Sequence, residues 1–321
     1  MVTLEAVQAA ARTVYAAAIR TPLIRVELPE HPIRALYLKL ELLQPIGSFK
    51  IRGAYHAMSD LSADTLAGGV WTVSAGNAAQ GVAFAARLLG APCSVLVMNT
   101  APAAKIRAIE RLGARIVLAS YDECWDAVIA HGSPRMHGHF IHPFDDDRFI
   151  AGNGTLALEI LEDLPDVDAI VAPLGGGGLL AGIKAVMDAR RPEARIYAAE
   201  PETAAPLAAS LAADAPRFFD DWAPSFVDGA GGKSVLDTMW PLLRGVSGSI
   251  VVSLDEVASA MRLVAERARV IAEGAAACAV AAALSDKLLP DAAGDLKIVA
   301  VLSGGNVDLS RFAALTGTNN R

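Results

Sequence analysis

The sequence predicts an α/β fold in which parallel strands alternate with helices. Short apolar runs rich in β-branched residues alternate along the chain with stretches of helical periodicity, an order typical of parallel α/β layers. Hydrophobic residues make up 53% of the 321 residues, which is enough for a large core in one or two domains. Because no repeat, charge block or low-complexity linker divides the chain, a second domain should be inserted into the first one and not appended to it.

The strands are expected where short apolar runs are bounded by turn residues. They are Leu36–Leu40, Val70–Val73, Ser94–Met98, Arg115–Leu118, Ala169–Ala172, Arg195–Ala199 and Lys297–Leu302. Helices lie between them. One helix should begin after Ser253, because Glu256 completes a capping box. The apolar stretch Gly274–Leu284 is too short to cross a bilayer and is typical of a buried helix.

Composition narrows the class of protein. The net charge of −7 and the pI near 5.4 give no basic surface for nucleic acid or for an anionic membrane. The first residues, which include Glu5, show no charged-then-apolar leader, so we expect a soluble cytoplasmic protein. Cys93, Cys124 and Cys278 are too far apart for a metal site and odd in number, which favours free thiols in a reducing compartment.

The segment QPIGSFKIRGA, residues 44–54, places a lysine in an unusual setting. Lys50 follows a Pro/Gly/Ser turn, lies among Ile46, Phe49 and Ile51, and stands where a helix should begin. Burial and a helix N-terminus both lower a lysine pKa, which leaves a nucleophilic amine suited to Schiff-base chemistry. Taken alone, the segment favours the simpler alternative, a lysine that reaches the surface. Other motifs reverse that preference.

Four consecutive glycines, Gly175–Gly178 in PLGGGGLLAGI, stand between a predicted strand and a helix. Their backbone N–H groups can converge on an anion with the helix dipole behind them, as in a phosphate site. A dinucleotide site is the alternative. We disfavour it, because a run of glycines meets the G-x-G-x-x-G spacing trivially and its ribose partner would have to be Glu200.

Two further motifs are SAGNAAQG at residues 74–81 and VLSGGN at residues 301–306. The four motifs, in this order, resemble the fold-type II pyridoxal-phosphate (PLP) enzymes, most closely the threonine/serine dehydratase and serine racemase branch. The resemblance extends to residues 141–161 and 199–202. It implies a tryptophan synthase β-like fold with two doubly wound open-sheet domains. The large PLP domain would comprise residues 1–47 and 145–321, with a small mobile domain at 48–144 inserted in it and no C-terminal regulatory domain.

The resemblance also implies roles for individual residues. Lys50 would hold PLP as a Schiff base with Phe49 beside it, Asn77 would donate to the cofactor's phenolic oxygen, and Ser303 would meet the pyridine nitrogen. The substrate carboxylate would bind Ser74, Gly76 and Asn77. The cofactor phosphate would lie against Gly175, Gly176, Gly177, Gly178 and Leu179.

The chain departs from these relatives at three places. Ala78 stands where the family commonly has histidine, and Ala75 stands where the racemases have a serine that reprotonates the opposite face of Cα. Because a methyl group carries no acidic proton, elimination should prevail over racemisation. In the racemase branch a cation is held by a glutamate, here Glu200, and by a carboxylate six residues later, here Pro206. We therefore expect no tightly bound divalent metal and a structural role for Glu200; a weakly held monovalent cation stays open.

The resemblance implies a PLP-dependent ammonia-lyase, a homodimer, that converts L-threonine or L-serine to a 2-oxo acid and ammonia by α,β-elimination. The alternatives are a dehydratase for another β-hydroxy amino acid such as 3-hydroxyaspartate, an amino-acid racemase, or a PLP-binding protein without turnover. Specificity would come from the small domain and from residues 225–236. There Lys233 could pair with an acidic substrate side chain, but we favour a solvent-facing lysine. Phe144 would narrow the pocket if it points inward.

Overall fold

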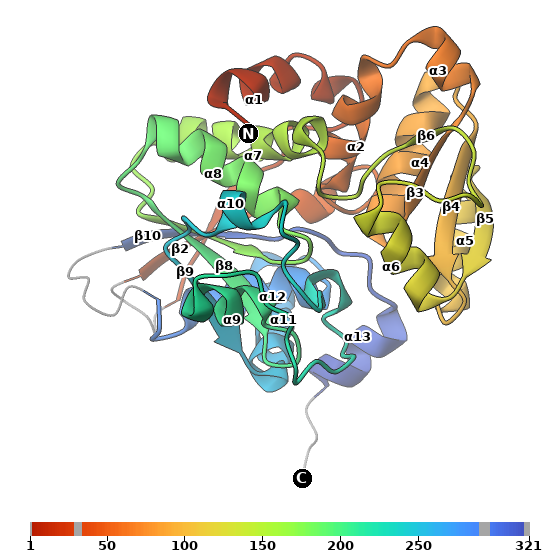
Figure 1. Cartoon of the computed structure of the whole chain (residues 1–321). Helices are drawn as coiled ribbons and strands as arrows, with labels where there is room; N and C mark the ends of the chain where they lie inside the picture. Colours follow the sequence, from red (N-terminus) through yellow and green to blue (C-terminus); the bar gives the residue numbers. More distant parts are fainter. Residues whose placement is uncertain (1, 29–33, 289–295, 318–321) are drawn as a thin grey trace.

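The chain forms two lobes, each built around its own β-sheet (Figure 1). The computed structural model describes residues 2–28, 34–288 and 296–317. Nearly all neighbouring strands are parallel, with helices on the faces of both sheets. The predicted α/β class with two open sheets is confirmed.

The larger sheet has six strands in the spatial order β1, β2, β10, β7, β8, β9. Every neighbouring pair is parallel except β1 with β2. The bounds are β1 Leu23–Val26, β2 Arg34–Lys39, β7 Ala169–Pro173, β8 Arg195–Pro201, β9 Gly248–Val252 and β10 Leu296–Val301. Consecutive side chains of a strand point to opposite faces, so Ile170 joins one hydrophobic core and Val171 the other.

Helices cover both faces of the larger sheet (Figure 1). The core on one face is built with α1 (Leu4–Ala11), α7 (Asp147–Asp163), α8 (Gly178–Arg190) and the short α10 (Trp240–Leu243). The core on the other face is built with α11 (Leu254–Ala268) and α12 (Gly274–Leu284). The remaining elements of this lobe are α9 (Pro206–Ala213), α13 (Leu309–Thr316) and the 3-10 turns η1 (Val14–Ala16), η2 (Glu41–Leu43) and η3 (Asp228–Ala230).

The smaller sheet has four parallel strands in the order β5, β4, β3, β6. Its strands are β3 (Val70–Val73), β4 (Cys93–Met98), β5 (Arg115–Ala119) and β6 (His139–Phe140). The helices of this lobe are α2 (Lys50–Ser59), α3 (Ala63–Ala67), α4 (Asn77–Leu89), α5 (Ala103–Glu110) and α6 (Tyr121–Ile129). Helix α2 packs against both α4 and α7, so the helix that begins at Lys50 lies where the two lobes meet.

All seven predicted strands are present, each with ends within two residues of the prediction. The helix after Ser253 has the predicted capping box, and α12 spans the predicted buried stretch. Three strands were missed. β1 and β6 are short, and β9 has an apolar run of only three residues, 250–252, after a glycine and a serine.

The smaller sheet takes its strands from residues 70–140, whereas the larger sheet takes strands from both sides of that range. The limits at 1–47, 48–144 and 145–321 stay a prediction. Three of the four motifs follow the carboxyl ends of parallel strands: β3 leads into Ser74, β7 into Leu174 and the glycine run, and β10 into Leu302 and Ser303. Open α/β sheets bind ligands at that edge.

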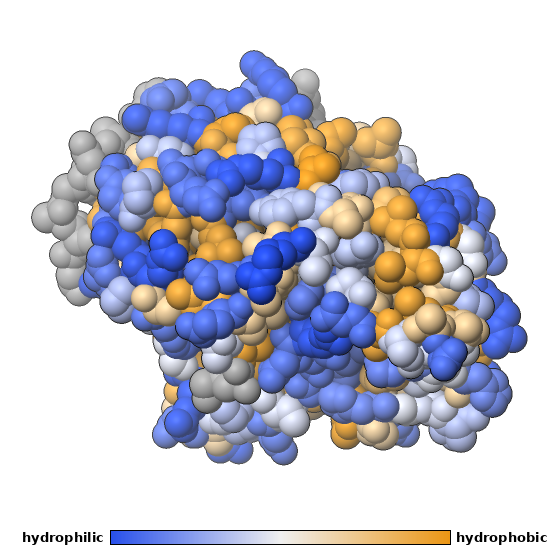
Figure 2. Space-filling view, turned by 90° about the horizontal axis from the view of Figure 1, so that it is seen from above, coloured by the Kyte–Doolittle hydropathy of each residue, from blue (hydrophilic) through white to orange (hydrophobic). Residues whose placement is uncertain are grey.

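Within the described ranges, none of the helices is long and apolar enough to cross a bilayer. On the face shown in Figure 2, hydrophobic patches are broken up by hydrophilic residues.

Candidate active site

Lys50 is the first residue of α2, and its amine points into the junction between the lobes. Its Nζ donates a hydrogen bond to the carbonyl oxygen of Pro143 at 2.6 Å. The ring centroids of Phe49 and Phe149 lie 5.3 and 5.2 Å from the same atom. Burial lowers the pKa of Lys50 to about 8. The side chain of Lys50 is half-buried and its amine is turned toward Pro143 and two aromatic rings, so the predicted lysine at a helix start is present and the surface-directed alternative is wrong.

A buried network of charges fixes the helix that carries Lys50. Arg52 is fully buried and donates to Glu41 through Nε at 2.8 Å and to Glu159 through Nη1 at 2.7 Å. Lys39, also fully buried, forms an ion pair with Glu159. Because Glu41 and Lys39 belong to the larger lobe and Glu159 to α7, Arg52 holds the first turn of α2 against that lobe.

The glycine run is linked to the Lys50 amine through Phe144, which directly follows Pro143. Gly177 has a φ of +93°, which favours glycine, and α8 begins at the next residue without a side-chain cap. A Cβ on Gly176 would lie 2.1 Å from the ring of Phe144, and one on Gly178 would lie 2.7 Å from the Phe144 carbonyl oxygen. Phe144 therefore points inward, onto the glycine run. Pro143, whose carbonyl oxygen accepts the hydrogen bond from Lys50, directly precedes Phe144 in the chain. We call the glycine run Gly175–Gly178 the glycine cup.

The end of β10 contacts the two residues directly before Lys50. The backbone N–H of Phe49 donates to the carbonyl oxygen of Ser303 at 3.0 Å, and Ser48 pairs with Gly304 in an isolated β-bridge. Ser303 is only 2% exposed. The structure thus brings the lysine motif and the VLSGGN motif together, although more than half of the chain separates them.

Asn77 is held by Glu273, which no sequence motif pointed to, and by Asn306, the last residue of the VLSGGN motif. Its Nδ2 donates to Oε1 of Glu273 at 2.8 Å, and its Oδ1 accepts from Nδ2 of Asn306 at 2.8 Å. The backbone N–H of Asn306 donates to Oε2 of Glu273 at 3.1 Å, which closes the ring. Burial and then the charge of Asp228 raise the pKa of Glu273 to about 7. A carboxylate directly before an apolar helix was the signal that could have revealed Glu273.

Residues 74–77, which we call the SAGN turn, leave the N-terminus of α4 open to an anion. The Oγ of Ser74 accepts from the N–H of Gly76 at 3.0 Å, and α4 begins at Asn77 without a side-chain cap. The first N–H groups of a helix have no partner within the helix, so this turn can bind a carboxylate. Ala75 packs against the core around β4 and α4 and offers only a methyl group.

Glu200 lies apart from this set. Its buried carboxylate accepts from the N–H groups of Leu207 and Ala208, both at 2.8 Å, and from the hydroxyl of Ser249. These contacts cap α9, whose first residue is Pro206. Glu200 therefore has the structural hydrogen-bonding role that the sequence favoured.

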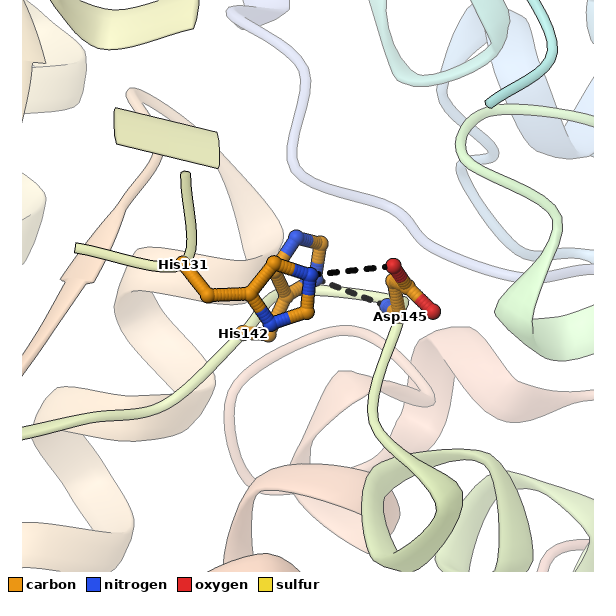
Figure 3. A group of neighbouring side chains, drawn as sticks. All are labelled: His131, His142 and Asp145. Carbon is orange, nitrogen blue, oxygen red and sulfur yellow. Dashed lines mark hydrogen bonds and ion pairs between the residues drawn. The ribbon is translucent and has the colours of Figure 1, made fainter. Parts of the chain in front are cut away.

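His131, His142 and Asp145 form a cluster whose ligand atoms all lie within 4.8 Å of one another (Figure 3). In His142, Nδ1 accepts the N–H of Asp145 at 2.7 Å, and Nε2 lies 3.2 Å from the carbonyl oxygen of Val128, to which it can donate. This tautomer leaves His142 no lone pair for a metal ion. Asp145 instead accepts from Thr238 at 2.7 Å and lies 3.1 Å from Nε2 of His131, so it joins the turn that follows α6 to the larger lobe.

Residues 14–304 match the model of the family described as "Pyridoxal-phosphate dependent enzyme". The chain belongs to this family. It is 39% identical to an L-threonine ammonia-lyase of Thermotoga maritima over 97% of this chain and 77% of that protein. It is also 39% identical to human serine racemase over 86% of this chain and 83% of that protein. Among solved structures, maize serine racemase superposes with a TM-score of 0.87 at 32% identity, covering 98% of this chain and 96% of that one.

The residues present fit the family's cofactor, PLP. A half-buried amine with a lowered pKa suits Schiff-base formation, and a glycine run at a helix N-terminus suits a phosphate. The same junction gathers Phe49, Asn77 and Ser303. Their individual contacts with the cofactor, like those of Leu179, stay predictions.

Proposed function

We propose that the chain is an ammonia-lyase that converts L-threonine or L-serine to a 2-oxo acid and ammonia. The observation that carries the proposal is the half-buried Lys50 amine, bonded to Pro143 next to the Phe144 that packs on the glycine cup, in a chain 39% identical to an L-threonine ammonia-lyase. Bound PLP supplies an electron sink for the electrons left when Cα loses its proton. The activity is tested by measuring ammonia release from L-threonine, L-serine and 3-hydroxyaspartate. A protein that carries PLP but releases no ammonia from any of them would contradict the proposal.

In this proposal each residue has a distinct task. The Lys50 amine holds the cofactor and then removes the Cα proton of the substrate. The glycine cup and Leu179 bind the cofactor phosphate, and Ser303 faces the ring nitrogen. Ser74, Gly76 and the first N–H groups of α4 bind the substrate carboxylate. Glu273 and Asn306 fix the Asn77 amide, so that its nitrogen can also serve the cofactor's phenolic oxygen.

Elimination is favoured over racemisation by the methyl group of Ala75. A positioned acid typically contributes about 10²–10⁴-fold, so we expect ammonia release from L-serine to exceed D-serine formation by at least about 100-fold. Replacing Ala75 with serine should raise D-serine formation, and Ala75→Val is the control for a change in size alone. Chiral chromatography measures both. Equal rates of D-serine and pyruvate formation in the unmodified enzyme would favour a racemase.

The lowered pKa of Lys50 predicts how the rate of cofactor capture depends on pH. Only the neutral amine attacks the cofactor aldehyde, and its fraction grows as the pH approaches about 8, where the buried amine loses its proton. The capture rate of the apoenzyme should therefore rise about tenfold per pH unit below that value and level off above it. Stopped-flow absorbance measures the rate. A rise that continues to pH 10 would mean that the amine is solvated like an ordinary lysine.

A homodimer, a cytoplasmic location and the three domain limits belong to the same proposal. The family resemblance supports the homodimer, and the net charge of −7 gives no reason to expect nucleic acid as a partner. Light scattering of the holoenzyme tests the dimer, cell fractionation tests the location, and limited proteolysis near residues 48 and 144 tests the limits.

A further inference from the structure

One loop of the larger lobe covers the glycine cup. We call residues 225–236 the roof loop. A Cβ on Gly175 would lie 2.8 Å from the carbonyl oxygen of Gly229, and a Cβ on Gly232 would lie 3.3 Å from the carbonyl oxygen of Gly175. A Cβ on Gly229 would lie 3.5 Å from Oε1 of Glu273. The roof loop therefore packs directly on the cup and on the carboxylate that holds Asn77.

Lys233 of the roof loop lies between two aromatic rings. Its Nζ is 4.0 Å from the ring centroid of Tyr121 and 4.2 Å from that of Trp222. Tyr121 is the first residue of α6 in the smaller lobe, whereas Trp222 belongs to the larger lobe. The prediction that Lys233 faces solvent is wrong. The side chain is half-buried and joins the two lobes. Because the rings of Tyr121 and Trp222 flank its ammonium group, Lys233 is also poorly placed to pair with an acidic substrate.

Further contacts hold the same loop. Trp222 donates through Nε1 to the carbonyl oxygen of Gly231 at 3.0 Å, so one ring contacts both the ammonium and the backbone of the loop. Lys105 on α5 forms an ion pair with Asp228, a second link to the smaller lobe. The side chains of that pair are 31% and 49% exposed, and exposed ion pairs stabilise little. The half-buried cation between two rings is therefore the stronger link.

We propose that Lys233 is a positioning residue that ties the roof loop to the smaller lobe and so keeps one wall of the substrate site in place. This inference rests on the proposed function, because the position of the roof loop affects catalysis only if a substrate binds between the glycine cup and the SAGN turn. Lys233 touches neither the cup nor the turn; it acts through the roof loop. Its removal should weaken substrate binding without removing any group that performs the chemistry.

The test compares Lys233→Met with Lys233→Arg in the holoenzyme. We expect Lys233→Met to raise KM for L-threonine by about five- to thirtyfold, the loss of about 1–2 kcal/mol of cation–π interaction, with kcat changed less than about twofold. Lys233→Arg should restore KM, because a guanidinium also stacks on aromatic rings. Hydrogen–deuterium exchange of the roof-loop amides should be faster in Lys233→Met. Lys297→Met, which removes a lysine at the opposite end of β10 from Ser303, is the matched control.

Tyr121→Leu reaches the same link from the other lobe and should have the same two effects if Lys233→Met folds poorly. Unchanged roof-loop exchange in both variants would overturn the proposed link. Faster exchange with an unchanged KM would overturn the role of the loop as a wall of the substrate site. If the unmodified enzyme releases no ammonia, the proposed function fails, and the exchange measurement still decides whether Lys233 holds the loop.

Discussion

Replacing Lys50 with alanine is expected to abolish ammonia release, with kcat lower by at least about three orders of magnitude. The variant loses both the amine that holds the cofactor and the base that removes the Cα proton. It should still fold, because Arg52 and not Lys50 carries the buried ion pairs of α2. It should also still bind PLP without a covalent bond, through the glycine cup.

Steady-state ammonia release and the absorbance spectrum of the purified variant measure these two effects. Lys297→Ala, which removes a surface lysine paired with Asp166, serves as the control and should leave both unchanged. Turnover by Lys50→Ala within about tenfold of the unmodified enzyme would mean that another group is the base.

The largest effect on stability is expected at Arg52. Arg52→Met removes the guanidinium partner of Glu41 and leaves Lys39 as the one cation paired with Glu159 among the described residues. None of these four side chains is more than 1% exposed. Breaking a buried ion pair typically destabilises a protein by about 3–5 kcal/mol, because a desolvated charge is left uncompensated. We expect a loss of that size in the free energy of unfolding, measured by urea denaturation.

Arg20→Met is the matched control. Arg20 also pairs with two carboxylates, Glu162 and Asp163, but its side chain is 45% exposed. Exposed pairs contribute about 0–1 kcal/mol, so this variant should lose little stability. Similar losses in the two variants would show that the buried network does not hold α2.

Local patterns were sufficient to predict most of the secondary structure. The strand that ends at Val73, the strand that ends at Pro173 and the helix after Ser253 each carry their signal within a few residues. β1 is different: its Arg25 side chain is 56% exposed, and the strand forms only because β2 is there to pair with it. Such a strand depends on tertiary contacts that a short window of sequence does not contain.

The same division holds for the site. Lys50 and the glycine cup were predictable because each motif has its own chemistry. The carbonyl of Pro143 was not, because every residue has a carbonyl and only the fold brings this one to Lys50. Lys233 was misplaced for a related reason: its aromatic neighbours Tyr121 and Trp222 come from two different lobes. Pairings across long stretches of chain therefore had to come from the structure.

The most direct test of the central claim is borohydride reduction of the holoenzyme followed by peptide mapping. Borohydride reduces a Schiff base to a stable secondary amine, so the lysine that binds the cofactor keeps it through digestion. We predict that the yellow colour is bleached and that the cofactor is recovered on a single peptide, attached to Lys50. Recovery on another lysine, or on none, would contradict the assignment of Lys50 and with it the proposed mechanism.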